Sequence, residues 1–325
     1  MITIQFLAEW ALRSSILILS GTLLLWALRV KDPSIRLAAW TAMLCGSLAI
    51  PLLTAMAPRV PVPVRRAAAQ PFEAPVTIYR LETERVREAT PPKSAPMPVD
   101  WARAGLIAYG IVALALLLRL CVGLAMSLRL LGGSRPTDRA THGIPIRESD
   151  RVATPVTLGI VRPAIVLPPD WRQWDTAKLD AVLAHERSHI RRRDPAVQLL
   201  SALHRALLWH SPLSWFLHQR IVRVAEEASD DAAVAATRDR ALYAEVLLDF
   251  VRRAVPRPSW HGVPMARYGR ADERIHRILD GTALSRGVTR WSMAAILALG
   301  SPIAYLAASV AQAQAPCERV PLGRL

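Results

Sequence analysis

The stretch His185-Glu-Arg-Ser-His189 places two histidines four residues apart, with a glutamate directly after the first. In a helix this spacing puts His185 and His189 on one face, so that both imidazoles can reach a single metal ion. Glu186 lies about 100° further round the helix. There its carboxylate can take a proton from a metal-bound water. The motif predicts a catalytic zinc site with Glu186 as general base; the alternative is two surface histidines that happen to be four residues apart.

The residues on either side of the motif predict the helix that carries it. Asp175 or Thr176 can cap its start, and an apolar stripe follows. The pair Asp194-Pro195 ends this helix and begins another, with Asp194 as the N-cap and proline in the first turn. The motif is therefore expected on a helix rather than in a loop.

Composition points to a membrane protein. Of the 325 residues 52% are hydrophobic, and they gather in runs long enough to cross a bilayer. The net charge of +15 suggests nucleic acid or a membrane face as partner. In a protein with several spans, basic residues collect on the cytoplasmic side and hold the topology, so direct nucleic-acid binding is not expected. The three cysteines form neither a disulfide framework nor a CxxC metal site.

Four apolar runs predict a mainly α-helical membrane protein with four transmembrane helices. Residues 1–56 hold two of them, and residues 101–128 and 291–311 one each. A basic turn after the first run places this turn in the cytoplasm and the N-terminus outside. The proline-rich residues 57–100 are expected to form an extracytoplasmic linker, and residues 312–325 a short extracytoplasmic tail.

Residues 129–290 form the stretch long enough for a folded catalytic domain, and their excess of basic residues places them in the cytoplasm. Within them, residues 154–168 read as two short strands with the turn at 159–163, and the flanking prolines favour an edge hairpin. Residues 195–209 form an apolar helix that is too short to span a bilayer. Such a helix suits a position at the membrane interface.

A catalytic zinc site needs a third protein ligand and an open fourth position. In the helix predicted over residues 214–237, Glu226 shares a face with side chains expected to pack inward. Glu227 instead has Arg223 one turn back, which is typical of a solvated ion-pair face. Glu226 is therefore the predicted ligand. Asp230, one turn on, is placed to accept the free N–H of a ligand histidine and to fix its tautomer. The alternative is that all these acids simply solvate the helix.

Together these motifs resemble the BlaR/MecR family of membrane metallopeptidases. The resemblance rests on His185-Glu-Arg-Ser-His189 with Asp194, on residues 155–168 and 208–215, and on Glu226-x-x-Ser-Asp230. It implies a gluzincin-type α+β domain between the third and fourth spans, with Zn²⁺ on His185, His189 and Glu226, Glu186 as base and Asp230 behind the ligands. It also implies that the hairpin at 154–168 offers an edge strand along which a substrate peptide can lie extended.

The sequence departs from the family pattern at several points. Ser229 stands where the family usually has cysteine. His210 stands where asparagine is usual, so it either donates a hydrogen bond to the oxyanion or is merely interfacial. Antibiotic-sensing members carry a penicillin-binding domain after the fourth span, whereas here residues 312–325 follow it, so a sensor domain of that kind is not expected.

By this resemblance the protein is expected to be a zinc endopeptidase of the bacterial inner membrane that cleaves a cytoplasmic protein such as a transcriptional repressor. Its trigger would come through residues 57–100, the spans or a separate sensor protein. One alternative is a membrane quality-control protease of the same design. Another is a non-catalytic transducer whose zinc only holds helices together, although such a site would not need Glu186.

Overall fold

A computed structural model describes residues 3–56, 60–61, 100–253, 271–281, 285 and 287–311. The predicted linker lies almost entirely outside the described residues, and the predicted tail lies wholly outside them.

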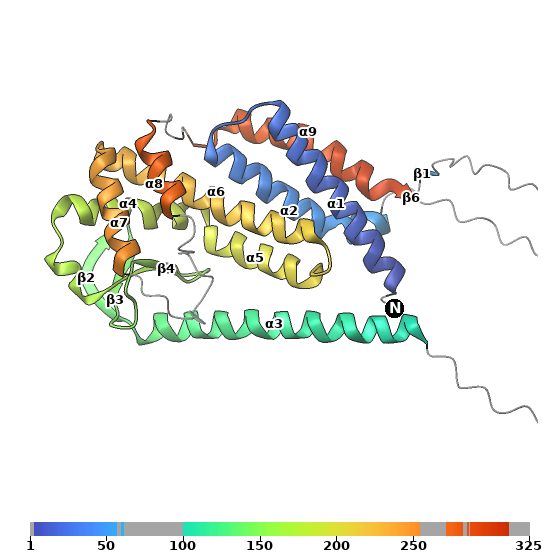
Figure 1. The fold of residues 1–325 in the computed structure, drawn as a ribbon, viewed down its shortest axis with the longest axis horizontal. Helices are drawn as coiled ribbons and strands as arrows, with labels where there is room; N and C mark the ends of the chain where they lie inside the picture. Colours follow the sequence, from blue (N-terminus) through green and yellow to red (C-terminus); the bar gives the residue numbers. More distant parts are fainter. Residues whose placement is uncertain are drawn as a thin grey trace, which may run out of the picture.

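The chain is mainly helical, with a small sheet at one end (Figure 1). The helices are α1 (Ile4–Ala27), α2 (Pro33–Met56), α3 (Trp101–Gly133), α4 (Thr176–Arg192), α5 (Asp194–Leu207), α6 (Pro212–Thr237), α7 (Arg240–Arg253), α8 (Ala271–Leu279) and α9 (Arg290–Ser309). The strands are β1 (Val60–Pro61), β2 (Arg135–Thr141), β3 (Ile144–Glu148), β4 (Val156–Leu158), β5 (Ala164–Leu167) and β6 (Val310–Ala311), and a 3₁₀ turn follows β5 at Pro169–Gln173.

Three helices in the described part of the chain, α1, α2 and α3, are long and apolar enough to cross a membrane. Large apolar side chains remain exposed along them, among them Leu23 and Ile111, as expected for surfaces that face lipid. The third helix is longer than predicted, because it continues from residue 128 to Gly133. The fourth predicted span is also a helix, α9, which packs along α1 and α2.

The long helices alternate in direction. α1 and α3 begin at one end of the molecule, while α2 and α9 finish there, and β1 pairs in parallel with β6 just beyond them (Figure 1). The four-stranded sheet, α4, α7 and α8 lie at the opposite end. The chain therefore has a helical bundle with its α+β part attached at one end.

The hairpin of α5 and α6 runs alongside the long helices. The His204 ring on α5 meets Ser47 in the middle of α2, with 2.7 Å between Nε2 and Oγ. The Tyr109 hydroxyl on α3 donates to the carbonyl of Leu207 at 2.6 Å. α5 packs against α2, α3 and α6, and the expected position of residues 195–209 at the membrane interface stays a prediction. Two polar groups of α5, His204 Nε2 and the Ser201 hydroxyl, find partners on neighbouring helices.

The sheet has the strand order β2-β3-β5-β4. β4 and β5 form the predicted antiparallel hairpin, whereas β3 pairs with β5 in parallel. The edge-hairpin prediction is correct for β4 and wrong for β5, because β5 lies between β3 and β4 with all four residues buried. Pro163 and Pro168 lie just outside β5, so neither removes a donor from the ladder.

α6 links the bundle to the sheet end. Leu217 and Ile221 in its first half are fully buried against α2, in a cluster with Trp40. Ala233 and Val234 near its other end belong to a separate cluster with residues of α4 and α7. Its middle turns, which include the acidic run, therefore lie where the bundle meets the α+β part.

Candidate metal centre

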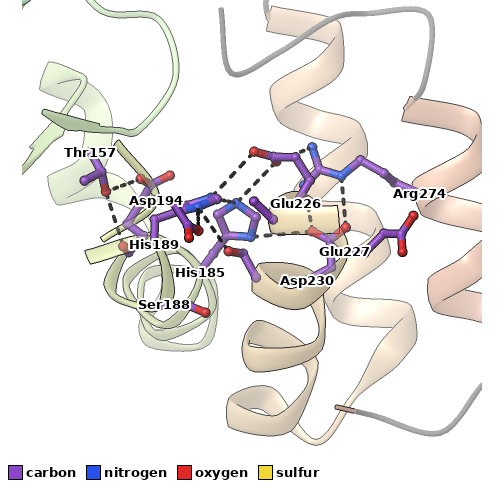
Figure 2. A network of polar contacts seen from close by, with 12 residues as sticks. Thr157, His185, Ser188, His189, Asp194, Glu226, Glu227, Asp230 and Arg274 are labelled. Carbon is purple, nitrogen blue, oxygen red and sulfur yellow. Dashed lines mark hydrogen bonds and ion pairs between the residues drawn. The ribbon is translucent and has the colours of Figure 1, made fainter. Parts of the chain in front are cut away.

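The packing of α4 on α6 brings His185, His189 and Glu226 together (Figure 2). One potential ligand atom from each side chain lies within 4.8 Å of the others. The two histidine Nε2 atoms are 3.2 Å apart, and the Glu226 oxygens lie 3.7 Å from His185 Nε2 and 3.6 Å from His189 Nε2. Ligand atoms about 2.0–2.1 Å from a tetrahedral zinc ion are about 3.3–3.4 Å from one another, so the spacing suits such an ion.

The chemistry of the three side chains also fits a cation. Glu226 Oε1 is buried and accepts no hydrogen bond, which is costly for a carboxylate oxygen unless a cation completes its shell. Burial lowers the pKa of His185 well below its usual value. Neutral imidazole is the form that binds metal.

The outer nitrogen of His189 meets a carboxylate. Asp194 Oδ2 lies 2.7 Å from His189 Nδ1 and also accepts from Arg192 Nη2 at 2.6 Å. The prediction that Asp194 is the N-cap of the next helix is wrong: Arg193, in the left-handed conformation, occupies that position and Asp194 is the first residue of α5. The carboxylate of Asp194 instead contacts the buried His189 and the partly buried Arg192. This contact was not foreseen, although the five-residue spacing from His189 was a signal for it.

The outer nitrogen of His185 meets a tyrosine. Asp230 lies behind His185 as expected, but its Oδ1 is 3.5 Å from Nδ1. The Tyr243 hydroxyl on α7 bridges the gap: it donates to Asp230 Oδ1 at 2.8 Å and lies 2.9 Å from His185 Nδ1. In this arrangement Nδ1–H of His185 donates to the hydroxyl, which leaves Nε2 free to bind metal. Nothing in the sequence pattern pointed to Tyr243.

Glu186 lies beside the cluster with its carboxylate held from the sheet. Thr157 on the edge strand β4 donates to Glu186 Oε2 at 2.7 Å. Burial raises the pKa of Glu186, while the Thr157 hydrogen bond favours the ionised form and acts in the opposite direction. The hydrogen bond from Thr157 thus orients the Glu186 carboxylate through its Oε2 atom.

Glu227 faces away from the cluster. It forms the expected ion pair with Arg223, at 3.2 Å, but also pairs with Arg36 on α2 at 3.2 Å. The prediction of a solvated face is wrong, because α2 covers this side of α6 and leaves Glu227 only 8% exposed.

His210 lies far from the cluster. It sits in the connection between α5 and α6, where its ring centroid is 5.8 Å from that of Tyr109. Glu226 lies 14 positions after Pro212 along α6, a rise of about 21 Å. His210 therefore cannot stabilise an oxyanion at this cluster, which leaves the interfacial alternative. Ser229 is fully buried, and its hydroxyl accepts from Arg192 Nη2 at 2.6 Å.

Comparison with known proteins places this site within a peptidase family. The family model described as BlaR1 peptidase M56 matches residues 12–278, which include both histidines, Glu186 and Glu226. The chain belongs to this metallopeptidase family, and its long apolar helices are consistent with a membrane protein.

A curated relative agrees with the family assignment. The regulatory protein BlaR1 of Bacillus licheniformis is 33% identical over 108 residues, a match that covers 32% of this chain and 18% of the relative. The match thus covers less than a fifth of the relative's length.

Proposed function

We propose that the protein is a zinc endopeptidase of the bacterial cytoplasmic membrane. In this proposal His185, His189 and Glu226 hold Zn²⁺ and Glu186 is the general base. The observation that carries it is the convergence of three ligand atoms around a buried Glu226 oxygen that lacks a hydrogen bond. A surface pair of histidines would not be buried opposite a carboxylate from another helix.

Bound zinc would supply a Lewis acid that lowers the pKa of a coordinated water. Glu186 would accept a proton from the attacking water and deliver it to the leaving amine of the cleaved peptide. Thr157 occupies Oε2 of Glu186, so Oε1 is the oxygen free to carry the proton. Tyr243 and Asp194 keep the ligand histidines in the tautomer whose Nε2 is unprotonated.

The edge strand β4 suggests how a substrate is held. One side of β4 pairs with β5, and its Thr157 contacts Glu186. A substrate segment that adds to the other side as a strand would run past the base. Only an extended segment can do so, which favours cleavage in a linker or an unfolded end. By family analogy the substrate is a cytoplasmic protein such as a transcriptional repressor.

The topology proposed is four spans, α1, α2, α3 and α9, with the sheet, α4, α7 and α8 in the cytoplasm. The alternating helix directions support it, since the starts of α1 and α3 and the ends of α2 and α9 lie together (Figure 1). The basic turn between α1 and α2 lies at the other end, nearer the sheet. A trigger would then reach the site through residues 57–100, the spans or a separate sensor protein.

The test is a comparison of wild-type protein with Glu186→Gln, which keeps the three ligands but removes the base. Both should hold about one zinc per chain, and only the wild type should generate new protein termini in cells. His185→Ala should lose both zinc and cleavage. Cleavage by Glu186→Gln at the wild-type rate would remove Glu186 from the mechanism. A quality-control protease would show many unrelated termini instead of one or a few.

A further inference from the structure

Arg274 on α8 joins two carboxylates of α6. Its Nε and Nη2 donate to the two oxygens of Asp230 at 2.9 and 2.6 Å, and its Nη1 lies 3.1 Å from Glu226 Oε2 (Figure 2). The guanidinium side chain is 19% exposed, and Asp230 is fully buried. The planar fork of arginine fits this double contact, whereas a lysine ammonium is a single point of charge.

This contact makes the two oxygens of Glu226 different. Oε2 lies 3.7 Å from His185 Nε2 but carries the ion pair with Arg274, while Oε1 is buried without a hydrogen bond and faces His189 Nε2 at 3.6 Å. A catalytic zinc ion takes three protein ligand atoms and keeps a fourth position open for water. A carboxylate that offered both oxygens would occupy that fourth position.

We propose that Arg274 is a positioning residue that makes Glu226 a one-oxygen ligand, so that a position on the metal stays open for water. This inference rests on the proposed zinc site. Arg274 acts from behind Glu226 and also fixes Asp230, whose other partner is the Tyr243 hydroxyl behind His185. The orientation of two of the three ligands therefore depends on one guanidinium.

The simpler account is that Arg274 only fastens α8 to α6. Arg277, one turn further along α8, offers a matched control, because it also bonds to α6. Its Nη2 donates to Asp231 and its Nη1 to the carbonyl of Glu227, so these two bonds go to the neighbours of Glu226 and Asp230 and not to the two carboxylates themselves. If docking of α8 were all that mattered, removal of either guanidinium would affect the metal site alike.

The experiment measures zinc affinity of the purified full chain by competition with a chromophoric chelator, together with the visible absorption of the cobalt-substituted protein. The variants are Arg274→Met, Arg274→Lys and Arg277→Met, and thermal unfolding checks that each is folded. We expect Arg274→Met to bind zinc about 10- to 100-fold more weakly and to show weaker cobalt bands, as coordination rises above four. Arg277→Met should match the wild type in both.

Arg274→Lys separates orientation from docking. It keeps the charge at α8 but cannot grip both carboxylates, so it should lose zinc affinity at a wild-type unfolding temperature. If Arg274→Met does not fold, the zinc affinity and cobalt spectrum of Arg274→Lys test the inference instead. Wild-type affinity and cobalt spectrum in a folded Arg274 variant, or an equal loss in Arg277→Met, would overturn the inference. Absence of metal binding by the wild type would instead refute the proposed zinc site.

Discussion

His185 and His189 occupy equivalent places one turn apart on α4, yet their outer nitrogens meet different groups. His189 is hydrogen-bonded to the carboxylate of Asp194, which also accepts from Arg192. His185 is hydrogen-bonded to the hydroxyl of Tyr243. A carboxylate makes an imidazole a stronger ligand than a neutral hydroxyl does. In the proposed zinc site the two histidines would therefore be unequal ligands although the motif is symmetric.

Thr157 provides a test of the base at this scale. Thr157→Val removes the hydroxyl that donates to Glu186, and that hydrogen bond favours the ionised carboxylate, so its loss should raise the pKa of Glu186 further above its usual value. The base works as a carboxylate, and activity is lost as the pH falls through its pKa. The acid limb of the kcat/KM profile should therefore move to higher pH.

Thr157→Ser is the control, since it keeps the hydroxyl and should restore the wild-type profile. Zinc content should be unchanged in both variants. An acid limb that stays in place in Thr157→Val would show that the observed ionisation does not belong to Glu186.

The sequence predicted the part of the site that depends on local periodicity. Helical spacing alone brings His185 and His189 to one face. The expected inward face selected Glu226, although Glu227 is equally buried, on a different side of α6. Tyr243 and Arg274 lie on other helices, and only tertiary packing brings them to the site. The sequence alone therefore could not predict which residues contact the proposed ligands from outside the cluster. Asp230 is the exception, because it lies one helical turn from Glu226.

The hairpin of β4 and β5 depends on Gly159 in its turn. Its φ of +90° is a region that L-residues rarely adopt, and a Cβ there would lie 2.6 Å from the carbonyl oxygen of Arg162. The sequence predicted this hairpin and its turn, but not the parallel partner β3. Parallel pairing joins segments far apart in the chain and leaves no turn signature between them.

Gly159→Ala should loosen β4. The strained backbone and the close contact together cost about 1–3 kcal/mol, so amide exchange over Val156–Leu158 should speed up and KM for a peptide should rise. Gly143→Ala is the matched control, because Gly143 also has a positive φ, of +78°, but nothing lies within 4 Å of its added Cβ. Equal exchange rates at β4 in the two variants would mean that the close contact in the turn does not matter.

The α5–α6 hairpin packs against the long helices of the bundle. Hydropathy could not predict this, since α5 is short and carries Arg205, and length is the main signal of a span. Its place is set by buried polar contacts: His204 Nε2 meets Ser47 Oγ, which in turn donates to Ser14 Oγ at 2.8 Å. α5 follows directly after the motif helix, so the site and the spans share one packed unit.

A double-mutant cycle measures this connection. Ser47→Ala and His204→Leu should each destabilise the protein, and their combined effect should fall short of the sum by about 0.6–1.7 kcal/mol, the range for hydrogen bonds between membrane helices. The cycle is read from reversible unfolding in detergent. Ser47→Ala combined with Ser201→Ala should be additive, because Ser201 bonds elsewhere, to Gln198 and His218. Additive effects of Ser47→Ala and His204→Leu would show that the contact between these two residues does not stabilise the packing of α5 on α2.

In the proposed site Glu226, and not its neighbour, completes the set of metal ligands. Glu226 and Glu227 are adjacent on α6 and both are 8% exposed, yet only Glu226 joins the histidine cluster. The direct measurement is the zinc content of purified wild-type, Glu226→Ala and Glu227→Ala protein. We expect about one zinc per chain in the wild type and in Glu227→Ala, and none in Glu226→Ala. Zinc retained by Glu226→Ala and lost from Glu227→Ala would contradict it.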